Sequence, residues 1–148
     1  MRVGDVCKKP VVTVTAGVPI VEVAKLMRSR HVGSVVVVDS GGTLKPVGIV
    51  TDRDLVIEVL AAGVDPLTMN AGDIMTGAPV VVPAGQDVMW ALKTMRDRGI
   101  RRLPVVDEQG LLVGILALDD MMQLLGGALG DIVQLLGTER LEENLRRA

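Results

Sequence analysis

The alternation of apolar and polar positions divides the chain into short strands and amphipathic helices. A short run rich in β-branched residues, at 11–15 and again at 80–82, precedes a stretch whose apolar residues recur at helical spacing. Two apolar runs separated by a glycine-containing turn follow each helix, and a second helix begins near Asp52 in one half and Asp119 in the other. The pattern therefore predicts a β-α-β-β-α unit that occurs twice.

The two halves also match residue by residue. Ile20 corresponds to Val88 at a constant spacing, which shortens by two residues before Gly48 and Gly114 because the first hairpin is longer. The repeats are predicted to span 1–62 and 71–126, with a linker at 63–70 and a helical appendage at 127–148, which Gly137 is expected to interrupt or kink.

This organisation predicts an α/β (α+β) fold of two tandem units packed sheet to sheet, followed by a C-terminal helix. A unit of about 60 residues buries too little surface to be stable alone, so each unit needs the other. Packing with pseudo-twofold symmetry would leave two related clefts, each bounded by elements of both units.

Composition and charge narrow the functional classes. The net charge of −2 gives no broad attraction for nucleic acid, and a single cysteine, Cys7, excludes an internal disulfide. Apolar residues make up 49% of the chain, yet no run approaches the roughly 18 residues that cross a bilayer, and no signal peptide is evident. We therefore expect a cytoplasmic protein that binds neither nucleic acid nor membrane.

The candidate chemistry lies where the third strand of each unit ends. The first repeat has GIVTDRDL at 48–55 and the second has GILALDDM at 114–121, so Ala117 of the second repeat corresponds to Thr51 of the first. Thr51 and Asp54 have the spacing of a helix capping box, which is the simpler interpretation of the motif taken alone. A carboxylate such as Asp54 can also accept bonds from both ribose hydroxyls, and the helix start with Arg53 suits phosphate. The repeat match favours this second interpretation.

The segments MRSRHVGSVVVVD, MRDRGIRRLPVVD and PVGIVTDRDL resemble the signatures of the cystathionine-beta-synthase (CBS) domain pair, or Bateman module. The resemblance covers roughly residues 1–126, and TDRDLVIEVLAAGVDP is similar to stand-alone paired repeats of the hypoxic-response type. It implies a regulatory module rather than an enzyme, with AMP, ADP, ATP, S-adenosylmethionine or NAD as the ligand and no required cofactor. The alternative is a structural or protein-interaction module with a vestigial cleft.

The resemblance also implies which residues form the clefts. In the first cleft, the early strand of the second repeat would face adenine, and one of two arginines would bind phosphate while the other is a surface charge; these residues are Pro79, Val80, Val81, Val82, Arg101 and Arg102. A second, weaker cleft would use Val11, Val12, Thr13, Ser34 and Asp120, and it lacks the hydroxyl that Ala117 replaces.

A homodimer is expected through helices, with an unidentified effector protein responding to the ligand. The runs at 55–60 and 121–125 are apolar over more than one stripe, and Trp90 matches Glu22 of the first repeat, which predicts an outward position. The predicted interface residues are Leu55, Val59, Trp90, Met122 and Leu125. No metal site is expected, because Cys7 and His31 have no second pair of ligands, and no catalytic motif is present.

Overall fold

The computed structural model describes residues 1–147 and confirms two copies of the β-α-β-β-α unit. The first copy contains β1 (Thr13–Thr15), α2 (Ile20–Arg30), β2 (Ser34–Val38), β3 (Pro46–Thr51), α3 (Asp52–Asp54) and its π-helical continuation η1 (Leu55–Ala61). The second contains β5 (Val82–Pro83), α5 (Val88–Arg98), β6 (Arg102–Val106), β7 (Leu112–Ala117) and α6 (Leu118–Arg147). Short elements precede each copy: α1 (Val3–Val6) before the first, and η2 (Pro66–Thr68), α4 (Ala71–Ile74) and β4 (Thr76–Gly77) before the second.

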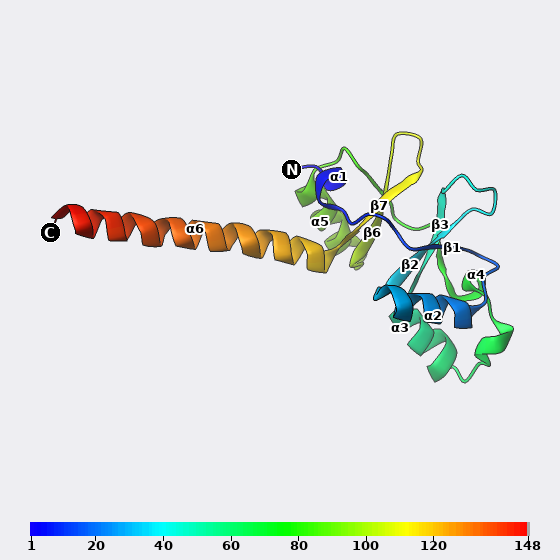
Figure 1. Cartoon of the computed structure of the whole chain (residues 1–148). Helices are drawn as coiled ribbons and strands as arrows, with labels where there is room; N and C mark the ends of the chain where they lie inside the picture. Colours follow the sequence, from blue (N-terminus) through cyan, green and yellow to red (C-terminus); the bar gives the residue numbers. More distant parts are fainter. Residues whose placement is uncertain (148) are drawn as a thin grey trace.

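Each copy builds its own sheet. In the first sheet β1 runs parallel to β2, which pairs antiparallel with β3, and β4 joins the free edge of β3. In the second sheet β5 is parallel to β6, and β6 is antiparallel to β7. Val36 and Val38 of β2 pack with Leu112 of β7 in a small core of their own, so the two sheets face each other as predicted (Figure 1).

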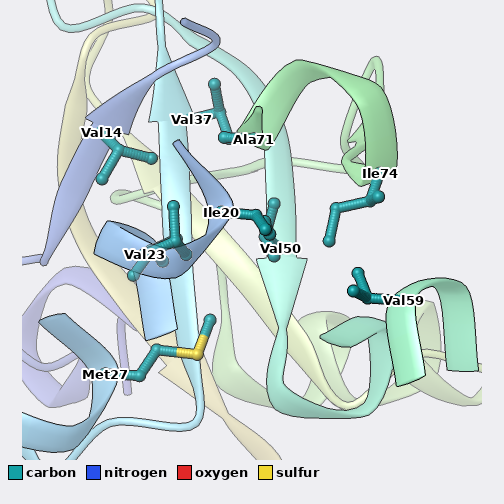
Figure 2. Close-up of a cluster of buried hydrophobic side chains, with 10 residues drawn as sticks. Val14, Ile20, Val23, Met27, Val37, Val50, Val59, Ala71 and Ile74 are labelled. Carbon is teal, nitrogen blue, oxygen red and sulfur yellow. The ribbon is translucent and has the colours of Figure 1, made fainter. Parts of the chain in front are cut away.

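The segments that precede the two copies are exchanged between them. Val3 of α1 is fully buried in the core of the second repeat, whereas Ala71 and Ile74 of α4 are buried in the core of the first (Figure 2). Equivalent backbone bonds hold both exchanges: the N–H of Gly4 donates to the carbonyl of Ala84, and that of Gly72 to the carbonyl of Ala16, each at 2.8 Å. The core of each repeat is therefore completed by the segment that precedes the other repeat.

A glycine lies beneath each exchanged segment. Met75 crosses over Gly48 in β3, and Cys7 crosses over Gly114 in β7, so closely that a Cβ atom on either glycine would overlap the crossing side chain. The matched glycines of the two sequence motifs are thus required for close approach rather than for backbone freedom. Sequence analysis found these glycines but not α1 or α4, which are each a single turn.

Three details of the sequence prediction are corrected. The early strands are shorter than predicted, since only Thr13–Thr15 and Val82–Pro83 are paired. Gly137 does not interrupt the C-terminal helix. Instead, α6 runs without a break from Leu118 to Arg147, so the second helix of the repeat and the appendage are one element that projects from the body (Figure 1).

The predicted interface residues fall into two groups. Trp90, Met122 and Leu125 are 43%, 63% and 49% exposed, so their side chains are available to a partner. Val59 is only 3% exposed and belongs to the core of the first repeat, where Leu55 also packs. Assigning Val59 to an interface was therefore wrong, because η1 turns that side chain inward.

Replacing Gly114 by alanine tests the crossing directly. The new Cβ would lie 3.1 Å from Cys7 Cβ and 3.3 Å from the carbonyl oxygen of Lys8, and it would overlap Cys7 Sγ. We expect Gly114→Ala to lower the free energy of unfolding by about 1–3 kcal/mol, as overpacking does in other cores. Gly85→Ala is the matched control, because a Cβ there meets nothing within 4 Å; equal denaturation midpoints for the two variants would contradict the account.

Candidate functional site

A cleft of about 560 Å³ opens between the two repeats. Three segments line it: the end of β3 with the first turn of α3, the stretch from β4 toward β5, and the turn from α5 into β6. The first segment comes from one repeat and the other two from the second, so the exchanged segment brings the walls together. Thr51, Arg53 and Asp54, singled out from the sequence, lie in this cleft.

Thr51 and Asp54 form a complete capping box at the start of the helix. The hydroxyl oxygen of Thr51 accepts the backbone N–H of Asp54 at 3.2 Å, and Asp54 Oδ2 accepts that of Thr51 at 2.7 Å. The interpretation of Thr51 and Asp54 as a helix capping box is thus correct. The cap uses one carboxylate oxygen and one lone pair of the hydroxyl, so Oδ1 of Asp54 and the Thr51 hydroxyl proton are left for a ligand.

The structure distinguishes the two arginines that the sequence could not separate. Arg101 is largely exposed and pairs with Asp119 of its own repeat at 3.1 Å. Arg102 is half-buried, and among the described residues no carboxylate forms an ion pair with it. A guanidinium nitrogen of Arg102 lies 3.0 Å, and Asp52 Oδ2 3.1 Å, from where a Cβ of Gly33 would stand, so the arginine reaches the first repeat near a carboxylate of the helix start. Arg53, which also lines the cleft, forms no ion pair among the described residues either, so both arginines could meet an anion there.

The early strand of the second repeat contributes less than expected. Pro79 and Val80 line the cleft together with Ala78, but Val81 and Val82 do not. Val82 is fully buried in the core of the second repeat, because it begins β5 and its side chain points away from the cleft side. The prediction extended the cleft lining to Val82. The lining ends two residues earlier, at Val80, because the chain turns into the core of the second repeat there.

The second cleft differs from the prediction. Asp120 lies at a shallower hollow of about 410 Å³, lined by residues of α6 and by Val6 and Lys8. Lys8 Nζ contacts Asp120 Oδ1 at 2.6 Å, and the Asp120 side chain is only 11% exposed. The opposite charge thus occupies one oxygen of the carboxylate that corresponds to Asp54, whereas the other oxygen, Oδ2, is buried without a hydrogen-bond partner among the described residues.

The remaining residues predicted for that cleft do not line the hollow. Val11 packs between the sheets, Val12 against the first core, Thr13 lies in β1, and Ser34 is 9% exposed within β2. The sequence analysis missed Lys8. The repeat register could have identified it, because Lys8 pairs with Ile115 as Thr76 pairs with Ile49.

Comparison with known families settles which fold family this architecture represents. The CBS domain model matches residues 3–61 and again 71–127. The chain belongs to the CBS-domain family. The resemblance stated from the sequence motifs is therefore confirmed, as is the pair of repeats.

Curated relatives extend the comparison beyond the family model. An uncharacterized protein of Methanopyrus kandleri is 42% identical over 124 residues, which are 84% of this chain and 62% of the relative. Hypoxic response protein 1 of Mycobacterium tuberculosis is 34% identical over 82% of this chain and 78% of its own length. The chain thus spans less than two thirds of the first relative and most of the second.

Solved structures of other proteins share the fold, with similar TM-scores to this chain. A CBS domain protein of Pyrobaculum aerophilum, complexed with AMP, has a TM-score of 0.75 and 31% identity over 81% of this chain and 89% of its own. The CBS domain pair of protein MJ0100, in complex with 5′-methylthioadenosine and S-adenosyl-L-methionine, has a TM-score of 0.77 and 29% identity over 86% and 98%. Hypoxic Response Protein I, with two coordinated zinc ions, has a TM-score of 0.73 and 30% identity over 83% and 98%.

Residues 1–147 contain no feature typical of a metal site or of a membrane-spanning helix. No three His, Cys, Asp or Glu side chains gather there as a metal site would require, and burial raises the pKa of the Cys7 thiol. No helix in the same part of the chain combines the length and apolar character needed to cross a bilayer.

The capping box makes a stability prediction that is independent of any ligand. Asp54→Ala removes the acceptor for the Thr51 N–H, and we expect the free energy of unfolding to fall by about 0.5–2 kcal/mol. Asp54→Asn keeps an amide oxygen at that position and should lose clearly less. Chemical denaturation of both variants measures the difference; equal losses would mean that the charge, rather than the hydrogen bond, stabilises the helix start.

Proposed function

We propose that this protein is a regulatory module that binds an adenosine-containing ligand in the first cleft and responds by a change of conformation or assembly. The observation that carries the proposal is the coexistence, in one cleft, of a carboxylate with a spare oxygen, Asp54, and two arginines, Arg53 and Arg102, that form no ion pair with any described residue. AMP, 5′-methylthioadenosine and S-adenosyl-L-methionine are bound by structural neighbours of the same family.

Each part of such a ligand has a matching surface. The apolar side chains of Ile49, Pro79 and Val80 suit the faces of adenine, and backbone groups of the segment that contains Pro79 and Val80 suit its edge. Asp54 Oδ1 suits the ribose hydroxyls, because an ionised carboxylate accepts strong bonds. The guanidinium of Arg102 suits a phosphate group.

The charge at Arg102 favours a phosphorylated ligand over a neutral nucleoside. A guanidinium nitrogen of Arg102 lies near Gly33 and the helix start, where the N–H groups of Asp52, Arg53 and Asp54 already donate within the protein, so a phosphate there would meet chiefly the planar cation. We therefore place AMP, ADP or ATP ahead of phosphate-free adenosine derivatives. We also propose that the module acts in the cytoplasm, and a chain with a single cysteine is consistent with a reducing compartment.

A structural or protein-interaction module with a vestigial cleft is the second candidate. The capping box supports it, since Thr51 and Asp54 satisfy each other without any ligand. Neither candidate assigns a catalytic step to the cleft.

Calorimetric titration with AMP and with adenosine distinguishes these functions. We expect Arg102→Ala to weaken AMP binding by about 10-fold to 150-fold, the value of one or two lost charge-assisted bonds, and to change adenosine binding little. Arg101→Ala is the matched control and should bind AMP nearly like the parent, since its charge is already paired with Asp119. Heat signals that show no binding of AMP, ADP or ATP to the parent protein would favour the second candidate.

Asp54→Asn tests the ribose contact with the cap retained. The variant loses the carboxylate that would accept hydrogen bonds from both ribose hydroxyls. The affinities for AMP and for adenosine should therefore fall by the same factor, about 10-fold or more. Unchanged affinity for both ligands in a folded variant would mean that Asp54 is only a cap.

A further inference from the structure

Asp52 places a negative charge in the first cleft that the capping box does not use. The cap is formed by Thr51 and Asp54, whereas Asp52 lines the cleft and its Oδ1 accepts the backbone N–H of Arg53, the next residue, at 2.9 Å. Within residues 1–147, Asp52 takes part in no ion pair. Its second carboxylate oxygen, Oδ2, is therefore an uncompensated acceptor at the wall of the cleft.

Asp52 and Arg102 approach each other from opposite repeats, with Gly33 between them. Asp52 Oδ2 lies 3.1 Å, and Arg102 Nη2 3.0 Å, from the position that a Cβ atom of Gly33 would take. Two atoms so close to one point are at most about 6 Å apart, a range in which charges influence each other near a protein surface. An anionic group that reaches Arg102 therefore also comes within range of the Asp52 carboxylate.

The charges that line the first cleft nearly cancel. The charged lining residues are three arginines and two carboxylates: Arg53, Arg101, Arg102, Asp52 and Asp54. Asp119 already pairs with Arg101 at 3.1 Å, so two arginines outside any ion pair stand against two carboxylates. A cleft with this balance offers much less attraction for a polyanion than a site lined by one sign of charge.

We propose that Asp52 is a specificity-determining residue of the first cleft, which sets a preference for a single phosphate group over a triphosphate. This inference rests on the proposed function, because it assumes that an adenine nucleotide places phosphate near Arg102. One phosphate group can meet the Arg102 guanidinium. Each further phosphate adds negative charge within range of Asp52, and like-charge repulsion then weakens binding. Removing the Asp52 charge should favour the longer nucleotide most.

A purely structural role for Asp52 leads to a different expectation. Asp52 is an acid in the first turn of α3, where a negative charge stabilises the start of a helix. Asp52→Asn keeps an oxygen for the Arg53 N–H and removes only the charge. If the role were structural, the affinities for all ligands would change by the same factor. The proposed role instead changes the ratio between the affinities for ATP and AMP.

Calorimetric titration of the full chain with adenosine, AMP and ATP measures this ratio. A chelator is present, because Mg²⁺ would bind the phosphates of ATP and neutralise part of their charge. We expect Asp52→Asn to bind ATP at least about 5-fold more tightly than the parent, AMP about 2-fold more tightly and adenosine equally, since Asp52 is exposed and partly screened.

Glu58→Gln is the matched control. It removes one negative charge from an exposed position of η1, the continuation of the same helix, outside the lining of the cleft. This variant should bind all three ligands like the parent. An equal gain in ATP affinity in both variants would reveal an effect of net charge alone and would overturn the role of Asp52. Thermal denaturation confirms that both variants are folded.

Salt provides a second readout, because the repulsion is electrostatic. The gain in ATP affinity of Asp52→Asn over the parent should shrink as the salt concentration rises from about 50 to about 500 mM. A gain that persists at high salt would overturn the electrostatic role, and so would an unchanged ratio of ATP to AMP affinity at low salt. Both of these results leave the nucleotide site itself intact, whereas a parent protein that binds neither nucleotide overturns the proposed function together with this inference.

Discussion

The structure depends on the reciprocal exchange of the segments that precede the two repeats. Each repeat leaves part of its core open, and the short helix of the other repeat closes it: α1 covers the second core through Val3, and α4 covers the first through Ala71 and Ile74. Because each crossing segment must pass directly over a strand, both strands need a glycine at that point. The exchange also fixes the clefts, since the crossing segment forms one wall of each.

The same geometry gives two clefts of unequal chemistry. Thr76 and Lys8 occupy equivalent places on the crossing segments, beside the carboxylates Asp54 and Asp120. Thr76 carries no charge and leaves Asp54 to the helix cap and to a ligand, whereas Lys8 holds Asp120 in an ion pair. Together with Ala117, which removes the capping hydroxyl, Lys8 supports the proposal that the first cleft is the stronger binding site and the second the weaker one.

Periodicity and internal repetition were enough to predict the order of the elements, because strands and helices of this length bury regular patterns of apolar residues. They could not predict α1 and α4, whose single turns are stabilised by the other repeat rather than by local spacing. The same limit explains Val59 and Val82: both positions are apolar, and only the packed structure decides whether such a side chain faces its own core, a cleft or a partner. The pairing of Arg101, which left Arg102 free, likewise depended on a contact with Asp119, eighteen residues away in the chain.

The most direct test of this account is the number of nucleotides that one chain holds. Native mass spectrometry of the protein titrated with AMP counts bound ligands without assuming where they sit. The account predicts that one AMP per chain binds clearly more tightly than any second one, because Lys8 pairs with Oδ1 of Asp120 in the second cleft. Two AMP molecules bound with equal affinity would show that the Lys8 ion pair does not weaken binding in the second cleft, and no bound AMP, ADP or ATP would contradict the nucleotide site itself.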